Sequence, residues 1–164
     1  MTIVGIDADT RRVAYAVLRG GVVSAVHTIE RATAKGGVLG NYDRNLRALF
    51  RYCAEDGAQV FIEDNYLPMA QKPGEETRNV RTFAALNRVA GELAQEGRRN
   101  AIMVEFVHPR EWQKEVLGAS GGREWVKARS EEVARLHWAQ IELSQHECDA
   151  ISIALYGLSR QNGI

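Results

Sequence analysis

This sequence has two cysteines, a formal net charge of zero and no long apolar run, and each of these features argues against a class of protein. Cys53 and Cys148 are too few and too far apart for a disulfide framework or a zinc site, which favours a reducing compartment. Lysine and arginine number 21, and aspartate and glutamate also number 21, so only local clustering can indicate a nucleic-acid binder. No apolar run is long enough to cross a membrane, and no basic segment followed by an apolar run opens the chain. We therefore expect a cytoplasmic protein without membrane contact.

Glycine-rich phosphate loops are also missing. The sequence contains no G-x-x-x-x-G-K-[ST] loop and no G-x-G-x-x-G after a strand-like segment, and the first turn, residues 7–11, has no glycine. These absences exclude two common kinds of nucleotide site. The 164 residues, of which 45% are apolar and 26% charged, have the size and composition of one soluble globular domain.

The pattern of apolar residues predicts an α/β domain. Alternating residues around a Gly20-Gly21 turn predict an antiparallel meander of three strands near the N-terminus. Helical spacing then alternates with short apolar runs, which predicts helices that connect parallel strands. The expected strands are 2–7, 12–19, Val22–Ile29, 58–63 and Ala101–Val107. The expected helices run from Leu39 to about Gly57, from about Thr77 to Gly97, on both sides of Gly118–Gly122, and from Ser144 to Leu158. Together they predict a five-stranded mixed sheet flanked by helices.

Two carboxylates end apolar strands of the expected sheet. Asp7 follows residues 3–6, and Glu63 follows residues 60–62. A carboxylate that closes a buried strand is costly unless it is paired or binds a metal, and sites in such sheets gather at the carboxyl ends of strands. Asp7 could instead cap a turn with Asp9, and Glu63 could be a solvated strand end. Two such carboxylates at adjacent strand ends favour a shared site.

The last expected helix carries a third carboxylate, Asp149, close to its start. His146 lies three residues before it, so both side chains project from one helix face. Ser144 and Glu147 match a capping box, and Glu147 is therefore interpreted as structural. His146 is interpreted as functional because a carboxylate shares its face. The remaining histidines are interpreted as ordinary polar residues: His27, His108 and His137.

An acidic cluster of this kind is typical of two-metal phosphodiester hydrolysis. In such sites, one ion activates the attacking water and the other stabilises the leaving oxygen. Mg²⁺ suits Asp7, Glu63 and Asp149 because it needs few carboxylates and leaves positions open for phosphate oxygens. The acidic cluster therefore predicts a metal-dependent nuclease.

The ordered motifs resemble those of the RuvC-type Holliday junction resolvases, within the ribonuclease H-like superfamily. Residues 3–7 and a second strand with Tyr15 resemble the first catalytic strand, although Ala8-Asp9 replaces the usual proline-glycine. Ile62-Glu63 resembles the second acidic motif. Residues 146–154 resemble the last motif, which is D-x-x-D or H-x-x-D followed by a small and apolar helix. The resemblance spans essentially the whole chain.

The resemblance implies a ribonuclease H-like fold and a homodimeric endonuclease that cuts branched DNA, such as a four-way junction, by paired nicks. It implies Mg²⁺ as the cofactor, with Mn²⁺ as a substitute, and branch-migration or recombination proteins as partners. Asp7, Glu63, His146 and Asp149 would be the catalytic and metal-binding tetrad. Paired incisions require two active sites related by a two-fold axis, and one domain supplies one site.

Further residues are assigned to DNA binding. Tyr66 falls where the family places an aromatic residue that wedges into the junction, although Tyr66 could instead pack beneath its own loop. The family's phosphate-binding lysines correspond to Lys114, one position late, and to Arg123 or Lys127. Basic residues that follow Glu63 are expected to hold DNA, with a solvated surface as the alternative. They are Lys72, Arg78, Arg81 and Arg88.

The helix beginning near Thr77 has apolar residues on more than one face. Val80, Phe83, Ala84, Asn87, Ala90 and Ala94 are expected to face the sheet. The expected dimer interface is formed by Leu86, Val89 and Leu93, which add apolar surface beyond that stripe.

Three other functions remain open. A ribonuclease H-like enzyme could act on RNA–DNA hybrids, flapped DNA or structured RNA, because the tetrad alone does not select the substrate. The fold could also serve a catalytically silent nucleic-acid-binding module. A sugar-kinase or actin-like ATPase shares the early meander, but 164 residues are too few for its usual two lobes.

Overall fold

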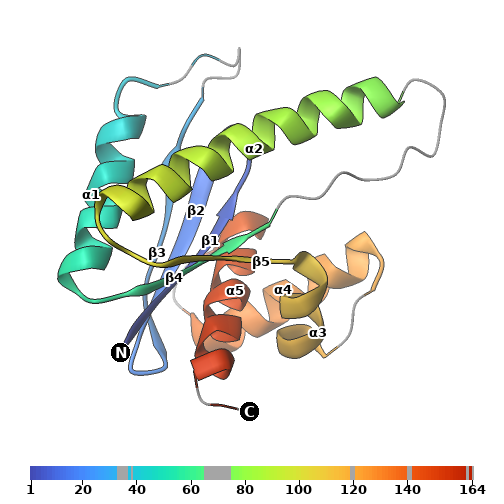
Figure 1. Cartoon of the computed structure of the whole chain (residues 1–164). Coiled ribbons are helices and arrows are strands. Elements are labelled where there is room, and N and C mark those ends of the chain that lie inside the picture. The colour runs from blue at the N-terminus through green and yellow to red at the C-terminus, as the bar shows by residue number, and fades with distance from the viewer. Residues whose placement is uncertain are drawn as a thin grey trace.

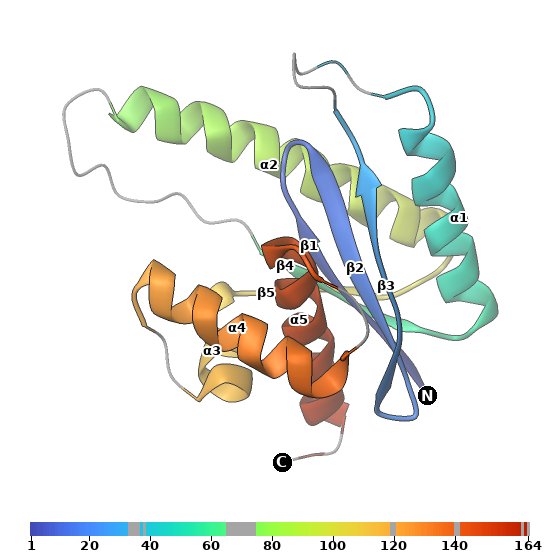
Figure 2. The ribbon, with the colours of Figure 1, turned by 180° about the vertical axis from the view of Figure 1, so that it is seen from behind.

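A computed structural model describes residues 1–32, 37, 39–64, 75–118, 121–139, 142–161 and 163, with the backbone alone for residues 75–78. The five strands form one sheet in the order β3-β2-β1-β4-β5. Helices α1 and α2 cover one face of this sheet, and α3, α4 and α5 cover the other (Figure 1, Figure 2). The predicted five-stranded mixed sheet flanked by helices is confirmed.

The elements follow the predicted order. The strands are β1 (Thr2–Ala8), β2 (Arg12–Arg19), β3 (Val22–Glu30), β4 (Gln59–Glu63) and β5 (Val104–Val107). The helices are α1 (Tyr42–Glu55), α2 (Glu75–Arg99), α3 (Pro109–Leu117), α4 (Arg123–His137) and α5 (Gln145–Gln161). β1, β2 and β3 pair in an antiparallel meander, whereas β1, β4 and β5 are parallel. None of the helices in the described part of the chain is long and apolar enough to span a membrane.

The fifth strand is shorter than predicted. The apolar run predicts residues 101–103 within it, but β5 begins at Val104. Ala101 has a left-handed backbone with φ of 53°, and the Ile102 N–H donates to the Gly97 carbonyl at 2.9 Å. This is the hydrogen-bond pattern of a Schellman helix end. The apolar segment after α2 therefore terminates the helix before the strand starts.

Side chains along β1 alternate between two cores. Ile3 packs with the α5 side, whereas Val4 and Ile6 pack with the α1 and α2 side. Gly5 faces α5 so closely that a Cβ there would lie 2.3 Å from the carbonyl oxygen of Ala150. By the same alternation, Asp7 belongs to the α5 face. The bare glycine thus lets the backbone of α5 cross β1 next to the strand-ending carboxylate.

The burial of α2 differs from the prediction at several positions, although Phe83, Ala90 and Ala94 of the expected sheet-facing stripe are half-buried, as is Leu86. Val89 and Leu93 are 1% and 0% exposed and lie in the core with Phe50, whereas Val80 is 53% exposed. The start of α2 projects past the sheet, so apolar residues there have no sheet to pack on (Figure 1). Ala84 and Asn87 are exposed as well. The prediction that Val89 and Leu93 form a dimer surface is therefore wrong.

Candidate acidic site

Strand pairing brings Asp7 and Glu63 to the same end of the sheet. β1 and β4 are parallel neighbours with Ile6 opposite Ile62, so the next residue on each strand is one of the two carboxylates. Phe61 packs in the core on the α5 side, and the period of two places Glu63 on that side too. Asp7 is only 8% exposed. The predicted juxtaposition of the two strand ends is confirmed.

The first turns of α5 complete the cluster. The start of α5 lies beside the ends of β1 and β4 (Figure 1, Figure 2). His146 Nδ1 is 2.6 Å from the Asp7 Oδ2 atom. Asp149 is close enough to Asp7 for the charge of Asp7 to raise the pKa of Asp149. Three elements far apart in sequence therefore bring the four predicted tetrad residues together.

Asp9 also belongs to this cluster, although its sequence context predicts only a role in the turn. His146 Nε2 lies 3.2 Å from the Asp9 Oδ2 atom, so the imidazole bridges two carboxylates. The other Asp9 oxygen, Oδ1, accepts from the backbone N–H groups of Arg11 at 2.6 Å and Arg12 at 2.8 Å. Asp9, not Asp7, therefore caps the turn. The signal in the sequence was a second acid two residues after a strand-ending one.

The hydrogen bonds around His146 shift two ionisation equilibria. Those with Asp7 and Asp9 raise the pKa of His146 to about 10. Partial burial of Asp9 acts to raise its own pKa, but His146 and the two backbone N–H groups outweigh burial and lower it to about 2. At neutral pH the imidazole is thus held as a cation between two anions.

Glu63 is held by a residue that sequence reasoning missed. Trp112 Nε1 on α3 donates to the Glu63 Oε2 atom at 2.9 Å. Burial and the nearby charge of Asp7 raise the pKa of Glu63 to about 8, against the lowering effect of the Trp112 hydrogen bond. Trp112 lies 49 residues further along the chain, so its contact with Glu63 had no local signal in the sequence.

Asp149 is oriented by two neighbours. Ser130 Oγ on α4 donates to the Asp149 Oδ1 atom at 2.6 Å, and Gln145 Nε2 donates to the same atom at 2.9 Å. Burial and the charge of Asp7 raise the pKa of Asp149 to about 6, although both hydrogen bonds favour the anion. Gln145 lies four residues before Asp149 on one helix, whereas the Ser130 contact is purely tertiary.

The donors suit a hard cation, but they are not gathered around one point. No group of three carboxylate, imidazole or thiol side chains in the described ranges is close enough to hold a metal ion. The oxygens instead accept hydrogen bonds from Trp112, Ser130 and Gln145, and Asp7 contacts His146. The effect of Asp7 on the pKa values of its two carboxylate neighbours shows that they are within electrostatic range. A divalent cation placed among these carboxylates would relieve their repulsion.

The predicted structural residues at this end of the molecule are confirmed. Glu147 Oε2 accepts from the Ser144 N–H at 2.9 Å and from its hydroxyl at 2.8 Å, as in a capping box. The other Glu147 oxygen accepts from Thr28 Oγ1 at 3.0 Å, which ties α5 to β3. His108 caps α3 by accepting from the Arg110 N–H at 3.2 Å. His27 lies beside the Tyr15 ring.

The residues predicted to bind DNA are not part of the acidic cluster as far as the described residues show. Tyr66, Lys72 and the side chain of Arg78 lie outside them. Lys127 pairs with Glu124 at 3.6 Å. The other predicted residues are exposed, without a contact to the tetrad among the described interactions: Arg81, Arg88, Lys114 and Arg123.

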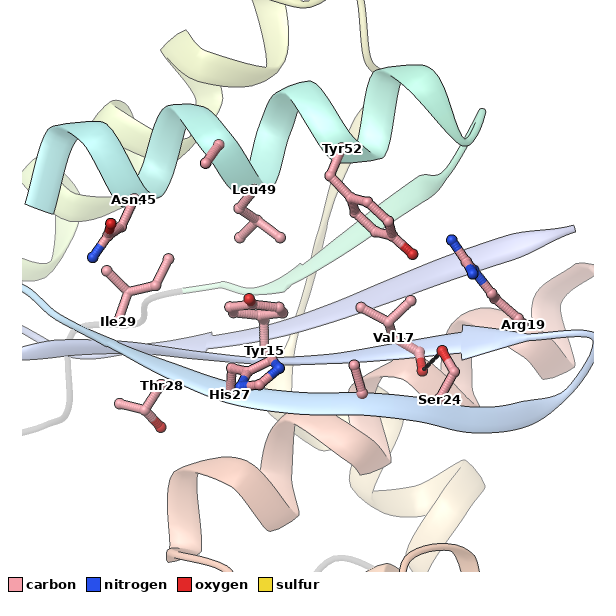
Figure 3. Close-up of a pocket in the computed structure, with 12 residues that line it drawn as sticks. Tyr15, Val17, Arg19, Ser24, His27, Thr28, Ile29, Asn45, Leu49 and Tyr52 are labelled. Carbon is pink, nitrogen blue, oxygen red and sulfur yellow. Dashed lines mark hydrogen bonds between the residues drawn. The ribbon is translucent and has the colours of Figure 1, made fainter.

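A cavity of about 580 Å³ lies away from the acidic cluster, between α1 and the strands β2 and β3. Tyr15, His27 and Tyr52 contribute rings to its lining, and Asn45 and Leu49 reach into it from α1 (Figure 3). Among the described residues that line it there is no carboxylate. The cavity therefore lacks the carboxylates that the acidic site provides.

Comparison with known proteins finds similar structures but no matching sequence. The sequence matches no protein-family model and none of the curated proteins. Among solved structures, Thermus thermophilus RuvC in complex with a Holliday junction substrate is similar with a TM-score of 0.67 and 14% identity, covering 99% of this chain and 96% of that one. A second structure of RuvC from the same organism has a TM-score of 0.65 and 15% identity, with 99% and 97% covered. The resemblance seen in the sequence is thus confirmed for the fold, and this chain has the RuvC-type, ribonuclease H-like fold over nearly its whole length.

Proposed function

We propose that this chain is a structure-selective endonuclease that cuts four-way junctions or other branched DNA. One observation carries the proposal: in a chain with the RuvC fold, Asp7, Glu63, His146 and Asp149 lie together at one end of the sheet. The carboxylates crowd together at a cost in stability, which a purely structural role does not explain. The Thermus thermophilus protein with this fold was solved with a Holliday junction, which supports branched DNA as the substrate class.

Each residue of the cluster has a role in this proposal. Asp7, Glu63 and Asp149 would hold Mg²⁺, or Mn²⁺ in its place. His146 would carry a proton at Nε2, or would be a further ligand after losing that proton. The bound cation would supply Lewis-acid stabilisation of the negative charge on the scissile phosphate. Trp112 orients Glu63, and Ser130 and Gln145 orient Asp149. These neutral donors fix the carboxylates without neutralising them.

Paired nicking would need a second copy of the chain. The buried positions of Val89 and Leu93 exclude them from an interface in the folded protein. The exposed face at the projecting start of α2, with Val80, Ala84 and Asn87, takes their place in the proposed homodimer. Two active sites related by a two-fold axis would then address the two strands of one junction.

The test is cleavage of labelled four-way junctions in Mg²⁺, beside flaps, linear duplexes and RNA–DNA hybrids. Asp7→Asn should keep the fold and reduce cleavage by orders of magnitude, because it removes an anionic oxygen at nearly constant volume. Asp64→Asn is the matched control, since Asp64 is an exposed carboxylate that follows β4. If flaps or hybrids are cut faster than junctions, they replace the four-way junction as the proposed substrate. Full activity of Asp7→Asn would refute the tetrad.

A catalytically silent DNA-binding module is a second candidate, favoured by one observation. The carboxylates are engaged in hydrogen bonds, and no three candidate ligands in the described part of the chain are arranged so that they could hold a metal ion. Titration of the protein with Mn²⁺, followed by calorimetry, separates the two functions. Binding that Asp7→Asn abolishes supports the nuclease, whereas junction binding without any metal binding supports the silent module.

A further inference from the structure

Three exposed arginines form a stripe along α1. Arg44, Arg47 and Arg51, named the arginine stripe, are separated by three and four residues and therefore share one face of the helix. At 1.5 Å per residue, the stripe is about 10 Å long. A shallow recess of about 440 Å³ lies along it, lined by Gly40, Asp43, Arg44, Arg47, Ala48 and Arg51.

The stripe has no ionic partner in the described part of the chain. Asp43 and Glu55 lie four residues from Arg47 and Arg51, the spacing at which a helical ion pair forms, yet no such pair is present. Other arginines do pair, as Arg19 does with Asp56 at 3.2 Å. Like charges three and four residues apart destabilise a helix. The stripe therefore opposes folding of α1, and an external anion would compensate it.

The end of α1 where the stripe begins is tied to the turn after Asp7. Arg31 donates to the Thr10 carbonyl at 3.1 Å, and its guanidinium lies over the ring of Tyr42, the first residue of α1. Arg31 also pairs with Glu92, to which the Tyr42 hydroxyl donates at 3.1 Å. α1 then runs along the flank of the sheet (Figure 1). The stripe thus leads away from the acidic end of the molecule.

We propose that the arginine stripe binds the phosphate backbone of a DNA duplex arm that leaves the active site. The inference rests on the proposed function and extends it to a surface outside the acidic cluster. A length of about 10 Å spans about three base pairs at 3.4 Å each. Guanidinium groups bind phosphate oxygens through two parallel hydrogen bonds, and the recess lets a rounded backbone approach them. The contact is independent of base sequence.

The test compares junction binding by two triple variants. The first replaces Arg44, Arg47 and Arg51 by glutamine. The matched control replaces Arg98, Arg135 and Arg160 by glutamine. These arginines are exposed on other helices, so the control removes the same charge elsewhere. Fluorescence anisotropy with a labelled four-way junction is measured in EDTA over a range of salt concentrations. The stripe variant should bind about 10- to 100-fold more weakly at ~0.1 M salt, with a salt dependence reduced by about two to three phosphate contacts.

The arm length of the DNA identifies what the stripe touches. The loss of affinity should be present with long-armed junctions and linear duplexes, and absent with junctions whose arms are cut to half a helical turn. Replacement of the three arginines by lysine should retain only part of the binding, because the charge is kept but the paired hydrogen bonds of the guanidinium groups are lost. Equal affinities of the stripe variant and the control would overturn the inference, and so would a loss that is the same for long and short arms.

The same experiment separates this inference from the proposed function. A wild-type protein that does not prefer junctions to linear duplexes contradicts junction selectivity. The duplex series then still judges the stripe, because a linear duplex presents the same phosphates as a junction arm. A junction-selective wild type with an unaffected stripe variant refutes the stripe alone. Circular dichroism melts of both triple variants check that the protein keeps its helix content and stability.

Discussion

Buried charges are compensated on one face of the sheet but not on the other. On the α1 and α2 face, Arg31 is buried, but both Glu92 oxygens accept from its guanidinium, so the charge is compensated. On the α5 face, Asp7, Glu63 and Asp149 crowd together, and the pKa values of the last two are raised by burial and by the charge of Asp7. The α1 and α2 face thus has a charge-balanced ion pair, whereas the α5 face has an excess of negative charge.

This difference indicates which face was shaped by stability and which by chemistry. An ion pair with matched geometry holds α2 against β3 and α1. Repelling carboxylates reduce the stability of the folded state, and selection for folding alone would replace them. Their presence is explained if a cation joins them during function. Substitutions at Gly5, at the pair Glu63 and Glu92, and at Asp9 test this comparison, in decreasing order of expected effect.

The largest effect is expected where the backbone of α5 meets β1. Gly5→Val should destabilise the protein by about 3 kcal/mol or more, because the new side chain would collide with backbone atoms of Ala150 and Ala154. Displacement of α5 would also carry His146 away from Asp7, so cleavage should be lost together with stability. Thermal unfolding and junction cleavage measure the two effects.

The control for this variant lies on the opposite face. Gly91 is in the interior of α2, and a Cβ there would meet nothing within 4 Å. Gly91→Ala should therefore stabilise the protein by about 1 kcal/mol, as expected from helix propensity. A stable, active Gly5→Val protein would show that α5 does not approach β1 so closely.

The second test makes the same change, glutamate to glutamine, on each face of the sheet, at Glu63 and at Glu92. The pKa of Glu63 in the folded protein, about 8, lies above its ordinary value of 4.5. The folded state therefore binds the proton more tightly, and its stability falls as pH rises from about 4.5 to about 8. Glu63→Gln should remove this loss and gain on the order of 1–3 kcal/mol at pH 8 without metal, but nothing at pH 4. Chemical denaturation at the two pH values measures the difference.

Glu92→Gln should have the opposite sign. It leaves Arg31 buried without an anionic partner, which should cost about 1–3 kcal/mol at pH 8. Addition of Mg²⁺ should raise the unfolding temperature of the wild type and of Glu92→Gln, but much less that of Glu63→Gln. If both substitutions destabilise equally, the contrast between the two faces does not hold.

The smallest effect is expected at Asp9, which contacts the tetrad through His146. In Asp9→Asn, the side-chain oxygen can still accept from the N–H groups of Arg11 and Arg12, so the turn should be kept. The charge that faces His146 Nε2 is lost, and kcat should fall about tenfold, a difference of about 1.4 kcal/mol, with unchanged junction affinity. Asp64→Asn, at an exposed carboxylate beside Glu63, is the control. An Asp9→Asn protein with wild-type kcat would show that His146 needs no second carboxylate.

The parts predicted well from the sequence are those with local causes. Asp7 and Glu63 were found because apolar runs end at them, and strand-end carboxylates are rare without a purpose. The shared face of His146 and Asp149 follows from helical spacing alone. Glu147 was correctly assigned to a cap because its partner, Ser144, lies three residues away.

The parts predicted badly depend on what a segment meets in space. Apolar residues occur on more than one side of α2, so periodicity could not decide which of them face the sheet. The sheet covers only the later part of α2, which buries Val89 and Leu93 and leaves Val80 exposed. The apolar residues 101–103 looked like a strand, but residues 101 and 102 form the cap that follows the last turn of α2.

Local sequence was enough to determine the order of elements, the α/β fold class and four of the residues in the acidic cluster, because hydrophobic periodicity and turn chemistry act over a few residues. Tertiary packing decided the second ring of contacts. Asp9 reaches His146 because α5 crosses β1 at Gly5, and Trp112 reaches Glu63 because α3 follows the strand next to β4. Contacts between distant segments depend on strand order and helix docking, which no local pattern encodes.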